Sequence, residues 1–333
     1  MMQNEIRVGP AGWSYTDWNG VVYPTHRPAG FHEAEYLARY FRVIEINTSF
    51  YRPLRPQLGQ VWARKLEGRK DFQFTAKLYR GFTHEGRLDR SEVRQYCEGL
   101  EPLVDSGLLG CVLMQFPWSF RLTQENLRHV LRLRSAFRQY PIAAEMRHAS
   151  WNSLETLRAF EDHGIAFCNI DQPQMNGCLP PTAHVTSEIG YVRLHGRNYQ
   201  EWFNFDESGQ EAGRPAVAAR YDYLYTQDQL AKWAGRIGDI SSRAKTTYVV
   251  TNNHFRGQAV VNALQILSDF AGETVETPPT LLEHYPELNY TARNLPPQRS
   301  LFYQDRSYQD RTPRRPARMP ARRTGVVAIY ARA

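Results

Sequence analysis

The sequence predicts an α/β fold, a (β/α)8 barrel of the TIM type with a disordered basic C-terminal tail. Three observations predict it: eight short runs of strand-forming apolar residues recur along the chain, each run ends in polar or aromatic side chains, and segments of helical spacing separate the runs. Strands that alternate with helices favour a parallel sheet, and barrels carry function on the loops after their strands. We expect residues 1–295 to form a single barrel domain and residues 296–333 to form the tail.

The predicted strands end at residues 12–15, 45–51, 74–79, 113–117, 145–151, 169–173, 193–198 and 251–258. Apolar residues at helical spacing follow at 31–41, 93–104, 127–137 and 154–160. Asn152 and Ser153 can cap the last of these helices and Gly164 can end it. Two long connections interrupt the pattern: we expect no helix in 172–189, and we expect 199–225 to fold over the barrel mouth ahead of a helix near 227–237.

Composition indicates where the charge lies. The net charge of the 333-residue chain is +7, and the segment from Pro296 to Ala333 holds nine arginines and two aspartates, so that the rest is neutral. This tail has few apolar residues, which predicts disorder. The start of the chain lacks the pattern of a secretory signal, and no apolar run is long enough for a membrane span, so we expect a soluble cytoplasmic protein. The four cysteines form no CxxC pair.

Strand alternation predicts which polar side chains face the barrel interior. On this basis Glu45 and Asn47 face inward, as do the pairs Glu145 with Arg147, Asn169 with Asp171, and Arg193 with His195, together with Lys77. Three acids then face three bases, and unpaired charge inside a protein costs several kcal/mol. We interpret Glu45 and Arg193 as a structural salt-bridge network, and the groups nearer the strand ends as functional.

Several phrases in fixed order resemble the YecE-like family, domain of unknown function 72: VGPAGWSYTDW, INTSFYRPLR, FTAKLYRGFTH, QFPWSF, EMRHASW, the aspartate of NIDQP, YVRLHGRN and NNHFRGQAVVNAL. The resemblance covers about residues 6 to 270 and implies a (β/α)8 barrel without an established reaction. That family is considered similar in architecture to sugar isomerase and endonuclease IV type barrels, which use metal ions. The comparable groups here are Glu145, Asp171, His195 and His254. Because Lys77 and Arg147 bring positive charge to the same mouth, no cofactor is firmly implied, and a divalent metal stays an alternative.

Catalytic candidates follow the third, fifth, sixth and seventh predicted strands. Lys77 is suited to act as a Schiff base nucleophile, a general base or an anion clamp; its structural alternative is a partner for Glu145. Asp171 and Glu145 can serve as a general acid and base, with His195 as a proton carrier. The structural alternative for His195 is a satisfied hydrogen-bonding group.

Binding candidates cluster after the last two predicted strands, where barrels commonly hold phosphate. HGRN at 195–198 and NNHFRGQA at 252–259 predict an anion site, unless the second phrase only shapes a tight turn. Aromatic residues near the mouth can stack on a ring or simply close the barrel. The predicted contacts are Trp13, Tyr51, Gln115, Arg147, Arg197, Trp202, Asn252, Asn253, His254 and Gln258.

These observations favour a barrel that binds a small anionic ligand, a phosphorylated or acidic sugar, with acid and base chemistry such as isomerisation or hydrolysis. Whether it is an enzyme stays open. The alternative is a nucleic-acid-binding or endonuclease IV-like protein acting on phosphodiesters, with the arginine-rich tail as a further nucleic-acid contact. The chain lacks GxGxxG, GxxxxGK[ST], GxSxG and HExxH motifs, which disfavours P-loop, Rossmann, serine hydrolase and zincin chemistry.

Overall fold

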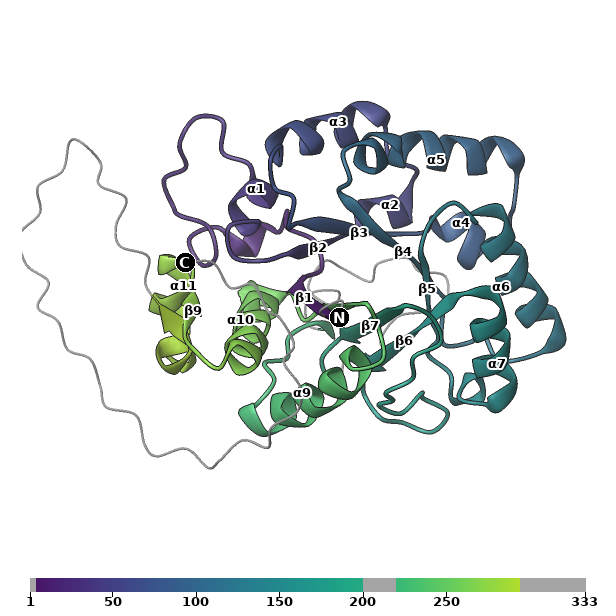
Figure 1. The fold of residues 1–333 in the computed structure, drawn as a ribbon. Coiled ribbons are helices and arrows are strands. Elements are labelled where there is room, and N and C mark those ends of the chain that lie inside the picture. Colours follow the sequence, from purple (N-terminus) through teal and green to yellow (C-terminus); the bar gives the residue numbers. More distant parts are fainter. Residues whose placement is uncertain (1–3, 200–219, 294–333) are drawn as a thin grey trace, which may run out of the picture.

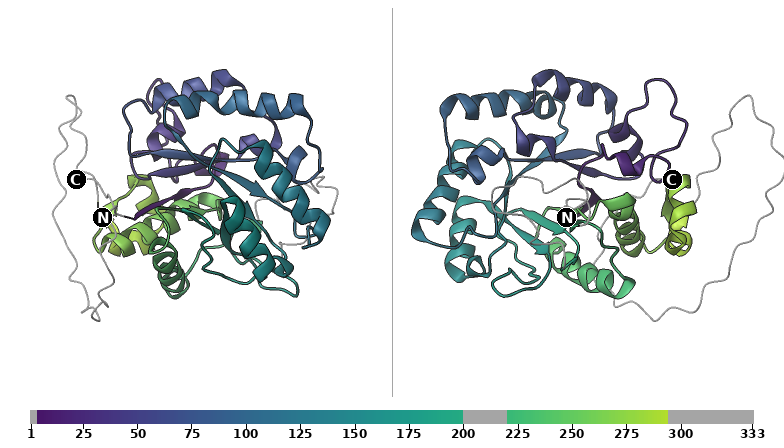
Figure 2. Two further views of the ribbon diagram at one scale, coloured as in Figure 1. Left: turned by 45° about the vertical axis from the view of Figure 1, so that its right-hand side comes forward. Right: turned by 180° about the vertical axis from the view of Figure 1, so that it is seen from behind.

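The computed structural model describes residues 4–199 and 220–293. At its centre, eight parallel strands curve into a nearly closed barrel with helices on the outside, which confirms the predicted fold (Figure 1 and Figure 2). The strands pair in the order β1-β8-β7-β6-β5-β4-β3-β2. Their bounds are β1 Glu5–Pro10, β2 Val43–Ile46, β3 Gln73–Lys77, β4 Leu109–Gln115, β5 Ile142–Glu145, β6 Ile165–Asp171, β7 Ile189–Leu194 and β8 Thr246–Thr251.

Helices lie in the five segments where the sequence predicts them, whereas the helices at residues 48–51, 56–65 and 80–83 were not predicted. The described helices are α1 Glu33–Leu37, α2 Thr48–Tyr51, α3 Pro56–Lys65, α4 Arg80–Thr83, α5 Arg90–Asp105, α6 Gln124–Ala136, α7 Leu154–His163, α9 Gln227–Ser241, α10 Gln258–Ala271 and α11 Pro279–His284. Short 3-10 helices are η1 Thr16–Trp18, η2 Ala149–Trp151, η3 Phe255–Gly257 and η4 Pro286–Tyr290. The caps predicted for α7 are confirmed, because the Ser153 hydroxyl accepts from the Thr156 amide and Gly164 adopts a left-handed φ of 62°.

The barrel closes unevenly around β1. This strand pairs with β8 along all six of its residues, from Glu5 with Thr246 to Pro10 with Thr251. Toward β2 it makes a bridge between Ala11 and Glu45, supported by a 2.8 Å hydrogen bond from the Gly12 amide to the Glu45 carbonyl. A Cβ at Gly9 would lie 1.8 Å from the Val43 carbonyl oxygen, so this seam requires a glycine.

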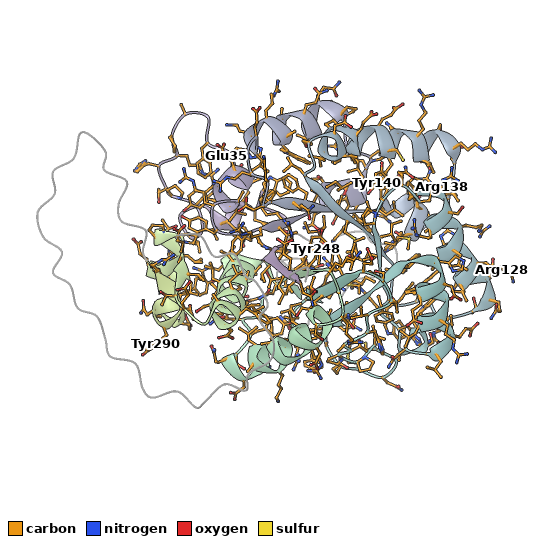
Figure 3. The ribbon with its side chains drawn as sticks, in the orientation of Figure 1. Glu35, Arg128, Arg138, Tyr140, Tyr248 and Tyr290 are labelled. Carbon is orange, nitrogen blue, oxygen red and sulfur yellow. The ribbon has the colours of Figure 1, made fainter. Side chains whose placement is uncertain are left out.

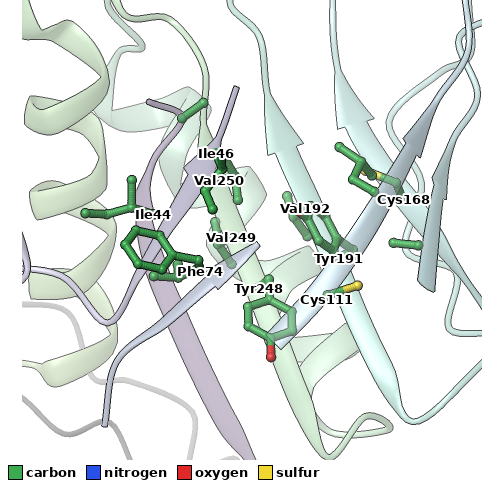
Figure 4. Close-up of a cluster of buried hydrophobic side chains, with 14 of the residues drawn as sticks. Ile44, Ile46, Phe74, Cys111, Cys168, Tyr191, Val192, Tyr248, Val249 and Val250 are labelled. Carbon is green, nitrogen blue, oxygen red and sulfur yellow. The ribbon is translucent and has the colours of Figure 1, made fainter. Parts of the chain in front are cut away.

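Side chains fill the space inside the barrel and between strands and helices (Figure 3), and one buried cluster of apolar and aromatic residues is shown in Figure 4. Inside the barrel, the rings of Tyr191 and Tyr248 lie with centroids 5.9 Å apart, and Cys111 and Cys168 are fully buried. Parallel strands in register present the same face, so the pairing of Cys168 with Tyr191 places both side chains on the interior side. This register matters for the polar residues of β6 described below.

The connections agree with the sequence in part. Residues 172–188, between β6 and β7, contain no helix, as expected. After α10 the chain adds α11, η4 and a small parallel pair, β9 Val275–Glu276 with β10 Ala292–Arg293, which were not predicted. The tail 296–333 and most of the 199–225 connection, including Trp202, lie outside the described residues, so the statements about them stay predictions. Within the described ranges, none of the helices is long and apolar enough to cross a membrane.

Candidate functional site

Polar side chains from several strands meet inside the barrel at the C-terminal ends of the strands. We call this set the inner cluster; its members are Glu45, Lys77, Gln115, Glu145, Arg147, Arg193, His195 and Asn252. Strand register explains why they converge. Gln115 of β4 lies beside Glu145 of β5 in the ladder. Glu45 of β2 lies beside Thr75 of β3, and Lys77 shares the face of Thr75 because it follows two residues later. The inward orientation predicted for Glu45, Lys77, Glu145, Arg193 and His195 is confirmed by the contacts below.

Arg193 lies at the centre of the inner cluster and is fully buried. Its guanidinium donates to Glu45 Oε1 at 2.7 Å, forms an ion pair with Glu145, and lies 3.3 Å from Gln115 Oε1. Glu45 also accepts a 3.1 Å hydrogen bond from the Tyr191 hydroxyl. One arginine thus holds two buried carboxylates, which fits the structural role predicted for Glu45 and Arg193.

His195 is held between Glu145 and Asn252. Its Nε2 lies 3.2 Å from Glu145 Oε1, and the Asn252 amide lies 3.0 Å from its Nδ1. Burial lowers the pKa of His195 to about 3, so the ring is neutral near pH 7. With Asn252 donating to Nδ1, the proton lies on Nε2 and points at Glu145. This arrangement fits the satisfied hydrogen-bonding group better than the proton carrier.

Glu145 is surrounded by donors. Arg147 Nε lies 3.0 Å from its Oε1, in addition to the contacts with Arg193 and His195. Burial alone would raise the pKa of Glu145, but Arg193, the His195 N–H and Arg147 outweigh it and hold that pKa well below the usual range. Glu145 is therefore an ionised anchor for the cations and a weak proton acceptor.

Lys77 occupies the end of β3 and is 9% exposed. Its Nζ lies 3.6 Å from Glu45 Oε1 and 5.7 Å from the centre of the Phe50 ring. Burial first, and then the charge of Arg193, lower the pKa of Lys77. This lowering raises the share of neutral amine on Lys77 at a given pH.

Asp171 faces the other way, and the predicted inward orientation of Asn169 and Asp171 is wrong. The register pairs Asp171 with Leu194 and Ile170 with Arg193, so Ile170 takes the interior face. Asp171 instead accepts two hydrogen bonds from Arg197, at 2.8 and 2.9 Å, on the helix side of the strands. The structure therefore does not bring Asp171 together with Glu145 and His195 as an acid and base pair.

A second set of polar side chains includes Asp171, Arg197 and the groups around them. We call it the outer cluster; its members are Asp171, Arg197, Tyr223, Tyr225, Asn253, Gln258 and Asn262. The Tyr225 hydroxyl bonds with Asp171 and accepts from the Gly196 amide. Asn253 donates to the Tyr223 carbonyl and to Asn262, both at 2.8 Å, and Gln258 accepts from the Tyr223 amide at 2.8 Å. These contacts tie the chain at 221–225 to α10 and its preceding turn, so Asn253 and Gln258 have a structural role here.

The aromatic candidates have different positions. Trp13 packs in the hydrophobic core, with its ring 5.0 Å from Trp62 and 5.7 Å from Phe74. Tyr51 is 68% exposed beside Phe50. His254 stacks on Tyr15 with a centroid distance of 4.3 Å, and burial followed by the charge of Lys77 lowers its pKa to about 4. His254 therefore belongs to the mouth, whereas Trp13 belongs to the core.

Sequence reasoning missed Arg220 and Tyr221, which follow the undescribed part of the 199–225 connection. The ring of Tyr221 lies 4.6 Å from His254. Burial would raise the pKa of Tyr221, but Arg220, Arg147 and Lys77 outweigh it and lower that pKa. The electrostatic coupling of Arg220 to Arg147 and Glu145 places it at the same mouth. The aromatic phrase YDYLY at 221–225 was the available signal.

In residues 4–199 and 220–293, no group of three or more His, Cys, Asp and Glu side chains has an arrangement that could hold a metal ion. Asp171 takes part in the outer cluster, and the described neighbours of His254 are aromatic rings and Lys77.

Comparisons with known proteins agree with the sequence resemblance. A family model described as "Protein of unknown function DUF72" matches residues 7–284. The chain is 29% identical over 274 residues to the UPF0759 protein YunF of Bacillus subtilis, covering 79% of this chain and 93% of that protein. A DUF72 family protein of Thermotoga maritima, TM1631, is 33% identical with a TM-score of 0.68, over 79% of this chain and 97% of that one. One from Enterococcus faecalis is 24% identical with a TM-score of 0.68, over 78% and 94%. The match to the family model over most of its length shows that this chain belongs to the DUF72 family of proteins of unknown function.

Proposed function

We propose that the protein binds a small anionic ligand, a phosphorylated or acidic sugar, at the inner cluster. The observation that carries the proposal is that basic side chains share two carboxylates. Lys77 and Arg193 both contact Glu45, and Arg147 and Arg193 both contact Glu145. Basic side chains that gather at a partly buried mouth favour an anionic ligand, because each can donate a charge-assisted hydrogen bond to it.

In this proposal the cations have different tasks. Arg193 is bound to both carboxylates and is fully buried, so it holds the site together. Lys77 and Arg147 are slightly more exposed, at 9% and 8%, and lie toward the mouth. They are the groups that contact the ligand, with Arg220 beside them. Arg197, also predicted to bind the anion, already forms two hydrogen bonds with Asp171.

Acid and base chemistry such as isomerisation or hydrolysis fits Lys77 best. A base that works near neutral pH needs a pKa close to that range, and burial shifts the pKa of Lys77 downward. Glu145 is held ionised by its cationic partners, and His195 has both ring nitrogens engaged. Lys77 is therefore the proton acceptor in this proposal, and Glu145 and His195 position the cations around it.

The test compares two variants that each remove one basic side chain. Lys77→Met is expected to weaken binding of sugar phosphates about 10- to 100-fold, since a hydrogen bond to a charged group contributes about 1.5–3 kcal/mol. Arg197→Met removes a cation of the outer cluster and is expected to leave affinity unchanged. Titration calorimetry with glucose 6-phosphate, ribose 5-phosphate and glucuronate, and with neutral glucose as control, measures both.

Two results would contradict the proposal. One is that glucose binds as tightly as its phosphate ester. The other is that both variants lose the same affinity, which would place the anion at the outer cluster. A saturable rise in Tm with ligand concentration, as mass action requires, provides an independent measure in the unmodified protein.

A further inference from the structure

Lys77 is an unusual lysine in this chain. Only five of the 41 basic residues are lysines: Lys65, Lys70, Lys77, Lys232 and Lys245. Lys77 is buried at the end of β3, whereas the other four are exposed or half-buried. Arginine keeps its proton at any ordinary pH, while lysine can lose its proton when it is desolvated. The one buried lysine thus has a chemistry that the surrounding arginines lack.

The carboxylate nearest to Lys77 is already engaged. Glu45 accepts from Arg193 at 2.7 Å and from the Tyr191 hydroxyl at 3.1 Å, whereas Lys77 Nζ remains 3.6 Å away. The ammonium therefore receives weak compensation from Glu45 while Arg193 opposes its charge. Burial and Arg193 lower the pKa of Lys77, which raises the share of neutral amine. A desolvated lysine beside another cation is the usual way to obtain a nucleophilic amine.

Tyr221, whose ring centroid lies 4.6 Å from that of His254, brings a hydroxyl to the same mouth. Tyr221 is coupled electrostatically to Lys77, and its ring contacts His254, which in turn stacks on Tyr15 at an interplanar angle of 11°. The Asn47 amide donates to the Tyr15 hydroxyl at 3.1 Å, so the base of this ring stack is fixed. Arg220, Arg147 and Lys77 favour the phenolate of Tyr221. The phenol can therefore release a proton at this site.

We propose that Lys77 captures the carbonyl carbon of a small anionic aldehyde or ketone as an imine, with Tyr221 as the proton donor. This inference rests on the proposed function and narrows its ligand to carbonyl compounds. The Lys77 lone pair forms the C–N bond while the carbonyl π electrons move to oxygen, and a proton passes from nitrogen to that oxygen. Tyr221 then protonates the hydroxyl, which leaves as water while nitrogen forms the double bond. The products are an iminium ion, one water and the Tyr221 phenolate.

Reductive trapping tests this step on the full chain. The probes are dihydroxyacetone phosphate, glyceraldehyde 3-phosphate and glyoxylate, each with sodium cyanoborohydride, which converts the iminium into a stable secondary amine. Peptide mass analysis is expected to find the adduct on Lys77, with the other four lysines as internal controls. Lys77→Arg keeps the positive charge and is expected to abolish labelling while the protein stays folded. Tyr221→Phe is expected to slow labelling about 100-fold, the low end for general acid catalysis.

The outcomes separate this inference from the proposed function. Glycerol 3-phosphate is an anion without a carbonyl group. If it binds and protects the protein against unfolding, while none of the three probes labels Lys77, the imine is refuted and the anion site stands. If neither glycerol 3-phosphate nor any probe binds, both ideas fail. Equal labelling of all five lysines, or unchanged labelling in Lys77→Arg, also overturns the inference. An unchanged labelling rate in Tyr221→Phe would show that Tyr221 is not the proton donor.

Discussion

The inner and outer clusters lie at the same end of the barrel, yet their charged groups are paired differently. In the outer cluster, Asp171 accepts two hydrogen bonds from Arg197, and the amides bind backbone groups of the neighbouring loop. In the inner cluster, Glu45 and Glu145 are shared among Lys77, Arg147 and Arg193. A one-to-one pair of charges fixes a structure, while basic groups that share a carboxylate can also bind a ligand. This difference supports the inner cluster as the anion site that we propose.

Removing the central arginine tests whether the inner cluster depends on a single residue. Arg193→Met leaves the carboxylates of Glu45 and Glu145 without their main partner. We expect a loss of about 3–5 kcal/mol in the free energy of unfolding, the usual cost of breaking a buried pair. Urea denaturation measures it. The triple variant Arg193→Met, Glu45→Gln, Glu145→Gln is expected to recover part of the loss, and a loss below about 1 kcal/mol in the single variant would contradict this account.

Acidification affects the inner cluster through its neutral histidine. His195 has a pKa of about 3 when folded, against about 6.5 when unfolded. Between these two pKa values the histidine is protonated in the unfolded chain and neutral in the folded protein. The free energy of unfolding therefore falls as the pH falls from about 6.5 toward 3. We expect His195→Gln to reduce this slope by about 1.4 kcal/mol per pH unit between about pH 6 and 4. Denaturation at each pH measures the slope, and an unchanged slope in His195→Gln would contradict this account.

Neutralising the carboxylate of the outer cluster is expected to affect stability without affecting binding. Asp171→Asn weakens both hydrogen bonds from Arg197, whose side chain is 26% exposed and can turn to water. The expected loss is about 2 kcal/mol of unfolding free energy, with unchanged affinity for sugar phosphates. Calorimetry on the same preparation measures the affinity. If binding falls with stability intact, Asp171 belongs to the ligand site after all.

The smallest expected effects come from two neighbouring asparagines that face opposite clusters. Asn252 contacts His195 inside the barrel, and Asn253 contacts Tyr223 and Asn262 outside it. Each change to Ala is expected to cost about 1 kcal/mol in stability. Asn252→Ala should also weaken anion binding, because the His195 ring that supports Glu145 loses its fixed tautomer. Identical binding in both variants would show that the two clusters act as one.

The sequence predicted the barrel well because strand and helix patterns are local. Alternation correctly placed Glu45, Lys77, Glu145, Arg193 and His195 inside the barrel, where each strand is bounded by apolar residues on its other face. It failed for β6 because all seven residues of this strand are buried and both of its faces carry apolar residues. Either face could therefore line the barrel interior. In the structure Cys168 and Ile170 face the barrel interior, so Asp171, the next residue, faces outward.

Other parts of the site depended on contacts that no local pattern contains. Trp13 lies in a loop after β1, and its ring packs against Trp62 of α3, far away in the sequence. Tyr221 reaches the mouth because Asn253, just after β8, and Gln258, the first residue of α10, hold the nearby Tyr223 backbone. Such placements arise from tertiary hydrogen bonds between distant segments, so they could be found only once the fold was known.

The uneven seam at β1 has a consequence for how the chain folds. Its six-residue ladder is made with β8, the last strand of the barrel, while its link to β2 is a bridge at Ala11 and Glu45. During synthesis, β1 therefore leaves the ribosome long before its main partner exists. Contacts so distant in sequence slow folding and leave apolar strand edges exposed meanwhile. Emerging chains cut short before β8 should depend on chaperones, and completion of the barrel should coincide with the emergence of its final strand.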